Sequence, residues 1–545
     1  MPEDRRRARR SLPVPRFAPK GRFARILAPK SARRTPAAQP TSAAPVRTAA
    51  EGIARNTAYA LLAQITTGVF TTLVTLYLAR TLGPGGFGLF ALALGVGQLA
   101  IVAGDAGIPQ SVARFLAESR SNDRAVTGLL ADALRLKVVI GALVSVTLVA
   151  AAGPLADAYD EPGLTWPLRA IAVSVFAEGL FGLYLTSFIA LGRNAVNARL
   201  ILFESMAEAG AIIALVALGA GAAGATFGRS IGYMVGAGLA LVVVARLLGR
   251  GAVRRVSGLG RTREIGTYAA PLLVTSGVYG LYTQVDVLII GALLGPAAVG
   301  VFAAPRRLTV PLAYLGQAVA NSVAPRQASG ASARRDPRAF TTSLRWLAIV
   351  HALPLAPIVV WAEPICGLLF GPGYEDSANV LRLLALFIFL RGLSPLISTT
   401  VNYLGHASRR IPIVLAALAV NVALDVSLLP VIGVAAAAIG VTVAYVVYVA
   451  AHLRICIVEL GLETRRLALT FLRALAAAGA AGAVLLLVGP GPLSVGAVGL
   501  GAAGGLGAFV AVLVLSGEIQ PREMRHARAV TTTRLSRLLA SPRLR

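Results

Sequence analysis

Long runs of apolar residues without charges recur along the whole chain, and they set its fold class. A helix needs about 20 such residues to cross a hydrocarbon layer roughly 30 Å thick. Runs of this kind predict fourteen membrane spans, at 56–80, 87–110, 129–151, 165–191, 198–218, 224–245, 265–293, 298–324, 346–369, 377–403, 411–429, 435–453, 467–488 and 495–516. The pattern therefore predicts an all-α polytopic membrane protein.

The composition supports this interpretation and excludes several other classes of protein. Hydrophobic residues make up 56% of the 545 residues, and charged residues only 14%. Soluble domains carry about a quarter charged residues. A soluble enzyme, a fibrous protein and a mostly disordered protein are therefore all excluded.

The placement of the basic residues predicts how the chain is oriented. The 52 Lys and Arg residues outnumber the 24 acidic residues, which gives a net charge of +28. Cytoplasmic loops of membrane proteins are rich in Lys and Arg. If the basic N-terminal tail is cytoplasmic, both termini are cytoplasmic, and neither Lys nor Arg occurs in the loops placed outside, at 81–86, 152–164, 219–223, 294–297, 370–376, 430–434 and 489–494. The excess charge is thus explained by topology in a cell membrane, and no nucleic-acid partner is expected.

An internal repeat predicts two related lobes. Leu82-Gly83-Pro84 recurs as Leu294-Gly295-Pro296 at an offset of 212, and Leu191-Gly192 recurs as Leu404-Gly405 at an offset of 213. Six spans separate the copies, so both copies have the same orientation in the membrane. This predicts two six-helix lobes related by a pseudo-two-fold axis along the membrane normal, with a cleft between them.

The spans and the charge runs together divide the chain into six segments. Two of them are the lobes, two are basic tails, one is a basic linker, and one holds two additional helices. The basic tails are expected to contact anionic membrane lipids. The predicted segments are a disordered tail at 1–52, an N-lobe at 53–247, a linker at 248–264, a C-lobe at 265–455, spans 13 and 14 at 456–516, and a C-terminal tail at 517–545.

Charged residues deep within the spans are the candidates for function, because a charge at mid-bilayer usually faces a cavity or a partner. Asp286 and Arg306 lie at similar distances from the Gly295-Pro296 turn, which places them at the same depth on consecutive helices. They form either a structural ion pair or part of a cationic lining. Arg307 and Arg391 have no nearby acid in the sequence and favour a ligand-binding role. Arg229, near a span end, is expected to extend its side chain toward the interface.

Three acidic residues in the N-lobe and a polar stripe in the C-lobe extend this candidate site. Glu178, Glu204 and Glu208 are candidates for proton coupling, because burial of a carboxyl group favours its protonated form. The alternative is that they pair with Arg across the cleft. Tyr279, Tyr282 and Gln284 form a stripe that either stacks on sugar rings or serves interhelix packing.

Signals for catalysis, metal and cofactors are missing from the sequence. No Ser or Cys nucleophile is paired with a base, and no phosphate-binding loop of the GxxxxGK type occurs. The four His and two Cys residues lack metal-ligand spacing. The sequence therefore predicts a protein that is not an enzyme, with no catalytic residue, metal site or cofactor.

Several motifs resemble one family of membrane transporters. Residues 78–84 (LARTLGP) and 87–90 (FGLF) are similar to the first two helices of the polysaccharide-transporter proteins, and 286–291 (DVLIIG) and 299–304 (VGVFAA) are similar to their seventh and eighth. The chain is identified as a member of the multidrug/oligosaccharidyl-lipid/polysaccharide exporter superfamily, over about residues 50–515.

The resemblance implies an O-antigen-type flippase for surface polysaccharide biosynthesis, which carries undecaprenyl-pyrophosphate-linked glycans between leaflets by alternating access. Arg306, Arg307 and Arg391 would bind the pyrophosphate, and the polar stripe would contact the sugars. Glycan-assembly enzymes are candidate protein partners.

The alternatives are a cation-coupled multidrug exporter of the same superfamily, a lipid II flippase, a membrane glycan polymerase or ligase, and a non-transporting scaffold.

Overall fold

The computed structural model describes most of the chain beyond residue 45. The chain divides into a short unit, Met1–Ile53, and a second unit, Ala54–Arg545, which contains every side chain discussed below. The predicted tails lie almost wholly outside the described residues, and so does most of the predicted linker. The described ranges are 46–119, 122–248, 262–328, 335–489, 491 and 494–519.

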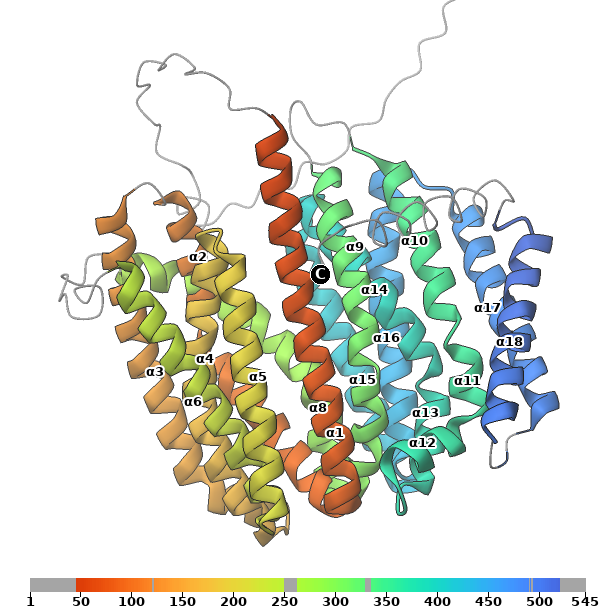
Figure 1. Ribbon diagram of the computed structural model, residues 1–545, viewed down its shortest axis with the longest axis horizontal. Helices are drawn as coiled ribbons and strands as arrows, with labels where there is room; N and C mark the ends of the chain where they lie inside the picture. Colours follow the sequence, from red (N-terminus) through yellow and green to blue (C-terminus); the bar gives the residue numbers. More distant parts are fainter. Residues whose placement is uncertain are drawn as a thin grey trace, which may run out of the picture. The chain divides into compact units, whose positions relative to one another are not determined.

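The first half of the molecule is built from helices joined by short loops (Figure 1). A short 3₁₀ turn, Pro162–Leu164, precedes α4. The helices are α1 (Val46–Asp105), α2 (Ile108–Glu118), α3 (Asp123–Ala158), α4 (Thr165–Ala190), α5 (Asn194–Ala217) and α6 (Gly221–Leu248).

The second half repeats this plan with more interruptions. Two of its predicted spans are each made of two helical pieces, and the span predicted at 346–369 is made of three. The helices are α8 (Thr262–Leu308), α9 (Val310–Val323), α10 (Pro337–Ala352), α11 (Leu355–Val360), α12 (Ala362–Phe370), α13 (Glu375–Leu383), α14 (Ala385–Tyr403), α15 (Arg410–Ile432), α16 (Ala435–Leu460), α17 (Thr464–Val488) and α18 (Val495–Leu515).

Two of the helices reverse direction within their length. α1 bends at Gly83 (φ 64°, ψ −179°) and α8 at Gly295 (φ 80°, ψ 178°). Each glycine precedes a proline, and its positive φ is a conformation that only glycine adopts at low cost. Among the described residues, twelve helices are long and apolar enough to cross a membrane. Because α1 and α8 each cross twice, the twelve account for fourteen crossings, as the sequence predicts.

Helix packing confirms the internal repeat. In the first half α6 packs against α4 and α5, and α3 packs against α4. In the second half α16 packs against α14 and α15, and α10 packs against α14. These are the same pairs once the offset of about 212 residues is applied. The fold thus has two six-helix lobes, and α17 and α18 pack on each other and on the second lobe through α10 and α11.

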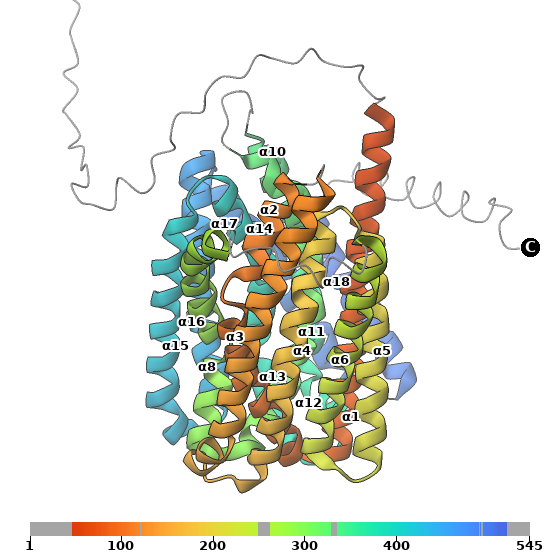
Figure 2. The ribbon, with the colours of Figure 1, turned by 90° about the vertical axis from the view of Figure 1, so that its left-hand side faces the viewer.

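Two predicted boundaries are wrong. The second span was expected to continue to residue 110, but α1 ends at Asp105 and a separate helix, α2, follows after a turn at Gly107 (φ 71°) (Figure 2). The ninth span was expected to begin at 346, but α10 begins at Pro337, where the Asp336 side chain accepts a hydrogen bond from the Ala339 amide. Charged residues in the first turns of α10 conceal its start from a hydropathy pattern.

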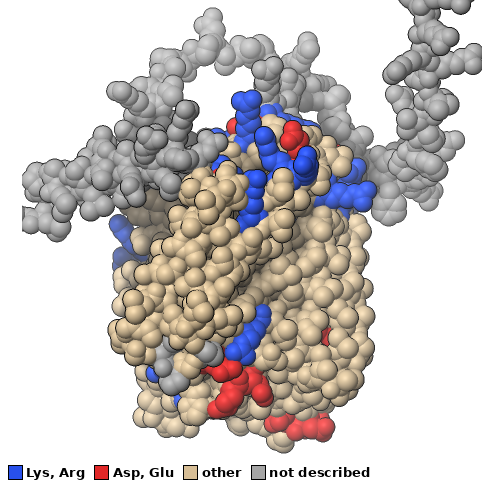
Figure 3. All heavy atoms as spheres, turned by 90° about the vertical axis from the view of Figure 1, so that its right-hand side faces the viewer, with Lys and Arg blue, Asp and Glu red and all other residues tan. Residues whose placement is uncertain are grey.

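Charged side chains are sparse in the middle of the face of the molecule that Figure 3 shows. Figure 3 shows a broad uncharged band, with basic side chains gathered mostly at one end of the molecule and acidic side chains mostly at the other. Such a band is the surface expected where a protein contacts lipid. The chain is a multi-pass membrane protein.

Candidate functional site

The predicted ion pair between two helices of the second lobe is present. Arg306 Nη1 lies 3.3 Å from Asp286 Oδ2, and Arg306 Nη2 donates a hydrogen bond of 2.6 Å to the Thr283 carbonyl. Asp286 is fully buried, and the Arg306 side chain is 15% exposed. Both residues lie on α8, on either side of its reversal, so the pair ties the two arms of this helix together. Arg306 is therefore anchored, and little of its guanidinium surface remains for a ligand.

Two residues of α15 extend this pair into a buried polar cluster that the sequence analysis missed. The Asn421 side-chain amide donates a hydrogen bond to Asp286 Oδ1. Asp425 is fully buried, its oxygens accept no hydrogen bond from a donor in the described residues, and its carboxyl group lies beside that of Asp286. A Cβ on Gly440 of α16 would lie 2.3 Å from Asp425 Oδ1, so only glycine leaves room for this carboxyl group. The available signal was the i, i+4 spacing of Asn421 and Asp425 in an apolar helix.

Arg307 lies beside the first lobe, against two aromatic rings. Its guanidinium carbon is 5.7 Å from the centre of the Phe87 ring and 5.4 Å from that of Phe90, both on α1. No carboxylate forms an ion pair with it in the parts of the chain that the structure describes. It is close enough to Glu208 and Arg229 for their charges to act on it. Arg307 is half-buried and held by aromatic faces, which attract a cation without neutralising it.

Arg391 on α14 is held in a similar way. Its guanidinium carbon lies 5.5 Å from the centre of the Phe387 ring. Its Nε atom is buried without a hydrogen-bond partner in the described chain, and the residue is half-buried overall. A cation in this state lacks the hydrogen bonds that usually accompany burial. Arg391 thus retains capacity to bind an anion.

The predicted polar stripe does not present one surface. The Tyr279 side chain is 47% exposed, whereas Tyr282 is buried and stacks on Tyr448 of α16 at 6.0 Å between ring centres. A Cβ added to Gly95 of α1 would lie 3.8 Å from the Gln284 Oε1 atom, so the Gln284 side chain faces the other lobe. Of the three residues, Tyr279 is the exposed one.

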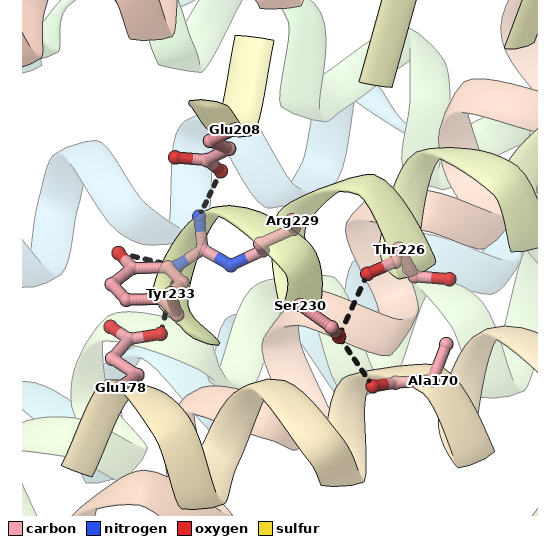
Figure 4. A network of polar contacts seen from close by, with 7 residues as sticks. All are labelled: Ala170, Glu178, Glu208, Thr226, Arg229, Ser230 and Tyr233. Atoms are coloured by element: carbon pink, nitrogen blue, oxygen red, sulfur yellow. Dashed lines mark hydrogen bonds and ion pairs between the residues drawn. The ribbon is translucent and has the colours of Figure 1, made fainter. Parts of the chain in front are cut away.

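Two of the three glutamates of the first lobe, Glu178 and Glu208, pair with one arginine (Figure 4). Arg229 of α6 contacts Glu208 of α5 at 2.8 Å and Glu178 of α4 at 3.0 Å, and donates to the Tyr233 hydroxyl at 3.2 Å. The Arg229 side chain is only 15% exposed. The expectation that Arg229 extends toward the interface is therefore wrong, because carboxylates on two neighbouring helices hold it inside the lobe. The pairing also lies within one lobe and not across a cleft.

Glu204 is the third carboxyl group and lacks a full set of partners. Its Oε2 atom accepts from the Ser205 hydroxyl, while Oε1 is buried without a partner in the described residues. A Cβ on Gly236 of α6 would lie 2.9 Å from Glu204 Cγ, and a Cβ on Gly232 would lie 2.5 Å from Glu208 Cβ. These glycines allow α6 to approach α5 closely. The cluster has three carboxyl groups and one guanidinium group, so full ionisation would leave it two charges negative.

A buried lysine ties together two helices of the first lobe. Lys137 of α3 is 1% exposed, and it donates to the Gly104 carbonyl at 2.8 Å and to the Asp105 carboxylate of α1. These contacts occupy two of the three donors of its ammonium group. This pair is structural.

A pocket of about 620 Å³ opens elsewhere, between α12 and α13. The backbone amides of Glu375 itself and of Gly373 hold the pKa of the Glu375 carboxyl below its usual range. Glu363 pairs with Arg382 at 2.9 Å at this pocket. Its lining contains Glu363, Glu375 and Asp376 against one arginine, which does not suit an anionic headgroup.

Family models match the chain in both halves. The model described as "Polysaccharide biosynthesis protein" matches residues 53–328, and a second family, MatE, matches residues 271–427. No curated protein matches the chain.

Solved structures show the same fold. One is a lipid II flippase, MurJ, in an inward closed conformation, with a TM-score of 0.69 and 12% identity, covering 84% of this chain and 99% of that one. Another is an inward-facing multidrug resistance MATE transporter, with a TM-score of 0.59 and 16% identity, covering 73% and 96%. A transporter from Pyrococcus furiosus has a TM-score of 0.53 and 14% identity, covering 76% and 97%. These neighbours are transporters and flippases, not enzymes.

Proposed function

Because the chain belongs to the polysaccharide biosynthesis protein family, a membrane transporter family of the multidrug/oligosaccharidyl-lipid/polysaccharide exporter superfamily, we propose that it flips a polyprenyl-pyrophosphate-linked oligosaccharide. The flippase would work by alternating access, in which each face of the membrane is opened in turn. The protein would lie in the cytoplasmic membrane with both termini in the cytoplasm. The absence of Lys and Arg from the loops of the opposite face supports this orientation.

One observation carries the choice of an anionic cargo. Arg307 and Arg391 are deep cations, held by aromatic rings and without ion-pair partners in the described chain. Hydrogen bonds between arginine and phosphate are charge-assisted and often bidentate. A pyrophosphate would supply the acceptors that both side chains lack, while Arg306, already paired with Asp286, would contribute positive potential more than direct contact.

The remainder of the cargo would be divided between protein and lipid. Tyr279, with its exposed ring, would stack on a sugar. Tyr282, which packs beside Tyr279, and Gln284, which lies next to α1, would flank the Tyr279 ring. The prenyl chain would stay in the bilayer. The basic tails would contact anionic lipids, and glycan-assembly enzymes would be protein partners at the cytoplasmic face.

The acidic clusters are the proposed coupling sites. Glu178 and Glu208 share one arginine and Glu204 pairs with none in the described residues, so full ionisation would leave uncompensated negative charge in a buried cluster, which is costly. Binding of a proton would relieve that cost, and Glu204, with an unpartnered oxygen, is its proposed position. Asp286, whose carboxyl group lies beside that of the buried Asp425, would form the equivalent site in the second lobe.

A second candidate cargo is the peptidoglycan precursor. The likeness to the lipid II flippase favours it, because that structure matches this chain over 84% of its length. Both cargoes present a prenyl pyrophosphate, so the same arginines would serve. They differ in the attached group, which the residues around Tyr279 would select.

The test is transbilayer movement in vesicles that contain the purified protein. We expect movement of a fluorescent undecaprenyl-pyrophosphate-linked oligosaccharide and none of a dye that multidrug exporters carry. Lipid II is assayed in parallel to separate the two candidate cargoes. Dye export without movement of either lipid would refute the proposal and support a drug exporter.

A further inference from the structure

The two reversals in α1 and α8 lie against each other in a reciprocal arrangement. A Cβ on Gly88 would lie 1.7 Å from the Pro296 carbonyl oxygen, and a Cβ on Gly300 would lie 2.0 Å from the Pro84 carbonyl oxygen. Adding the repeat offset of 212 residues to Gly88 and Pro84 gives Gly300 and Pro296. The internal repeat therefore makes the two contacts equivalent, with each lobe contributing the glycine to one of them.

Both contacts are between backbones, which makes them sensitive to a single methyl group. Glycine at such crossings allows two membrane helices to approach closely. A side chain can move to relieve a clash, but a carbonyl group in a helix cannot do so without moving the helix. The contacts thus form only when the lobes are closed against each other at the face that carries the two reversals, here called the kink face.

A polar clasp holds the same face. Arg80 of α1 donates from Nε to the Leu369 carbonyl at 3.0 Å, and from Nη2 to the Leu368 carbonyl. These are among the last carbonyl groups of α12, in the second lobe, where the helix dipole favours a cation. A Cβ on Gly373 would lie 3.3 Å from Pro84 Cγ, so the loop after α12 also covers the reversal of α1.

We propose that Gly88 with Pro296, and Gly300 with Pro84, form a two-point seal that closes the kink face, and that transport to this face requires both points to separate together. This inference rests on the alternating access proposed above, but not on the identity of the cargo. Because the two points are related by the repeat, one relative rotation of the lobes opens both.

The seal also links closure to the proposed anion site. Phe87 and Phe90, which hold Arg307, lie on either side of Gly88 in the sequence. Separation of Gly88 from α8 carries these rings away from Arg307. The guanidinium therefore has its aromatic support only in the closed state, which makes the affinity of the site for an anion depend on which face is open.

The test is a distance measurement across the kink face in membrane-reconstituted protein. Nitroxide labels are placed on cysteines at the exposed positions Ala220 and Ile432, which the offset of 212 relates, after Cys366 and Cys456 are replaced by alanine. Pulsed electron resonance then gives the distribution of separations.

The informative variants are Gly88→Ala and Gly300→Ala, and Gly85→Ala is the matched control. Gly85 lies in the same reversal, but a Cβ there meets no atom within 4 Å. We expect both informative variants to gain a longer separation, and to the same extent, while the control keeps the wild-type distribution. Distributions of folded Gly88→Ala and Gly300→Ala protein that coincide with that of Gly85→Ala would overturn the seal.

If neither glycine variant folds, Arg80→Gln takes their place, since the exposed Arg80 side chain is not needed for packing. The proposal then requires a shift toward longer separations, and it fails without one. The readout uses no substrate. A failure of the seal therefore leaves the flipping assay unaffected, and a chain that carries a different cargo would still show the change in separation.

Discussion

Replacing Arg229 by glutamine removes the guanidinium that pairs with two of the three clustered carboxyl groups. The guanidinium contacts Glu208 at 2.8 Å, Glu178 at 3.0 Å and the Tyr233 hydroxyl at 3.2 Å. Removing one partner of a buried ion pair costs about 3–5 kcal/mol. The Glu178 side chain is 20% exposed and the Glu208 side chain is 19% exposed. We therefore expect the lower end of that range, a loss of about 3 kcal/mol in the free energy of unfolding.

The same reasoning predicts that the loss is recoverable. The triple variant Arg229→Gln with Glu178→Gln and Glu208→Gln removes the guanidinium together with both carboxylates that contact it, and leaves Glu204, the proposed proton position, as the one carboxyl group of the cluster. Replacing both sides of a buried ion pair is often close to neutral. We expect the triple variant to regain most of the lost stability.

Unfolding of the purified protein by sodium dodecyl sulfate in mixed micelles measures these differences. Arg382→Gln is the control, because its ion pair with Glu363 is similar in length, at 2.9 Å, but lies at the surface. Its loss should stay below about 1 kcal/mol. An Arg229→Gln protein as stable as the wild type, or a triple variant no more stable than the single one, would refute the assignment of a buried, charge-compensating role.

Three further predictions follow from other parts of the site. Gly440→Ala forces a methyl group against a buried carboxyl group and should cost about 1–3 kcal/mol in the same unfolding assay, whereas Gly479→Ala, with open space around it, should not destabilise. Lys137→Met leaves the Asp105 carboxylate without its cation and should cost about 3 kcal/mol, and an unchanged midpoint would show that the pair is dispensable. Tyr279→Leu should raise the half-saturating concentration of the glycan-linked substrate about threefold to tenfold in the vesicle assay, with little change in the maximal rate. An equal effect on a prenyl pyrophosphate without sugar would argue against stacking.

Much of the fold is predictable because the bilayer imposes one dominant constraint. Each crossing needs a long apolar run, so the fourteen spans can be recognised from hydropathy, and the Gly-Pro pairs at 83–84 and 295–296 mark the reversals. The start of α10 was missed because Arg338 and Arg345 lie in its first turns, where a helix end near the headgroups tolerates charge. α2 was missed because a short amphipathic helix gives no long apolar run.

The candidate site is predictable only where its partners lie near each other along the chain. Asp286 and Arg306 lie at similar distances from one turn, so spacing alone made their ion pair one of two alternatives, and the structure shows the pair. The partners of Arg229 come from α4 and α5, and no spacing rule relates three separate helices. The aromatic support of Arg307 likewise comes from the other lobe, so it depends on how the lobes pack.

The central claim is that Arg307 and Arg391 bind a pyrophosphate, and direct binding tests it most closely. The dissociation constant for undecaprenyl pyrophosphate is measured with wild-type protein and with Arg307→Ala, Arg391→Ala and, as a surface control, Arg382→Ala. A charge-assisted hydrogen bond is worth about 1.5–3 kcal/mol, so each deep variant should bind about tenfold to a hundredfold more weakly while the control keeps wild-type affinity. Wild-type affinity in both deep variants would contradict the account.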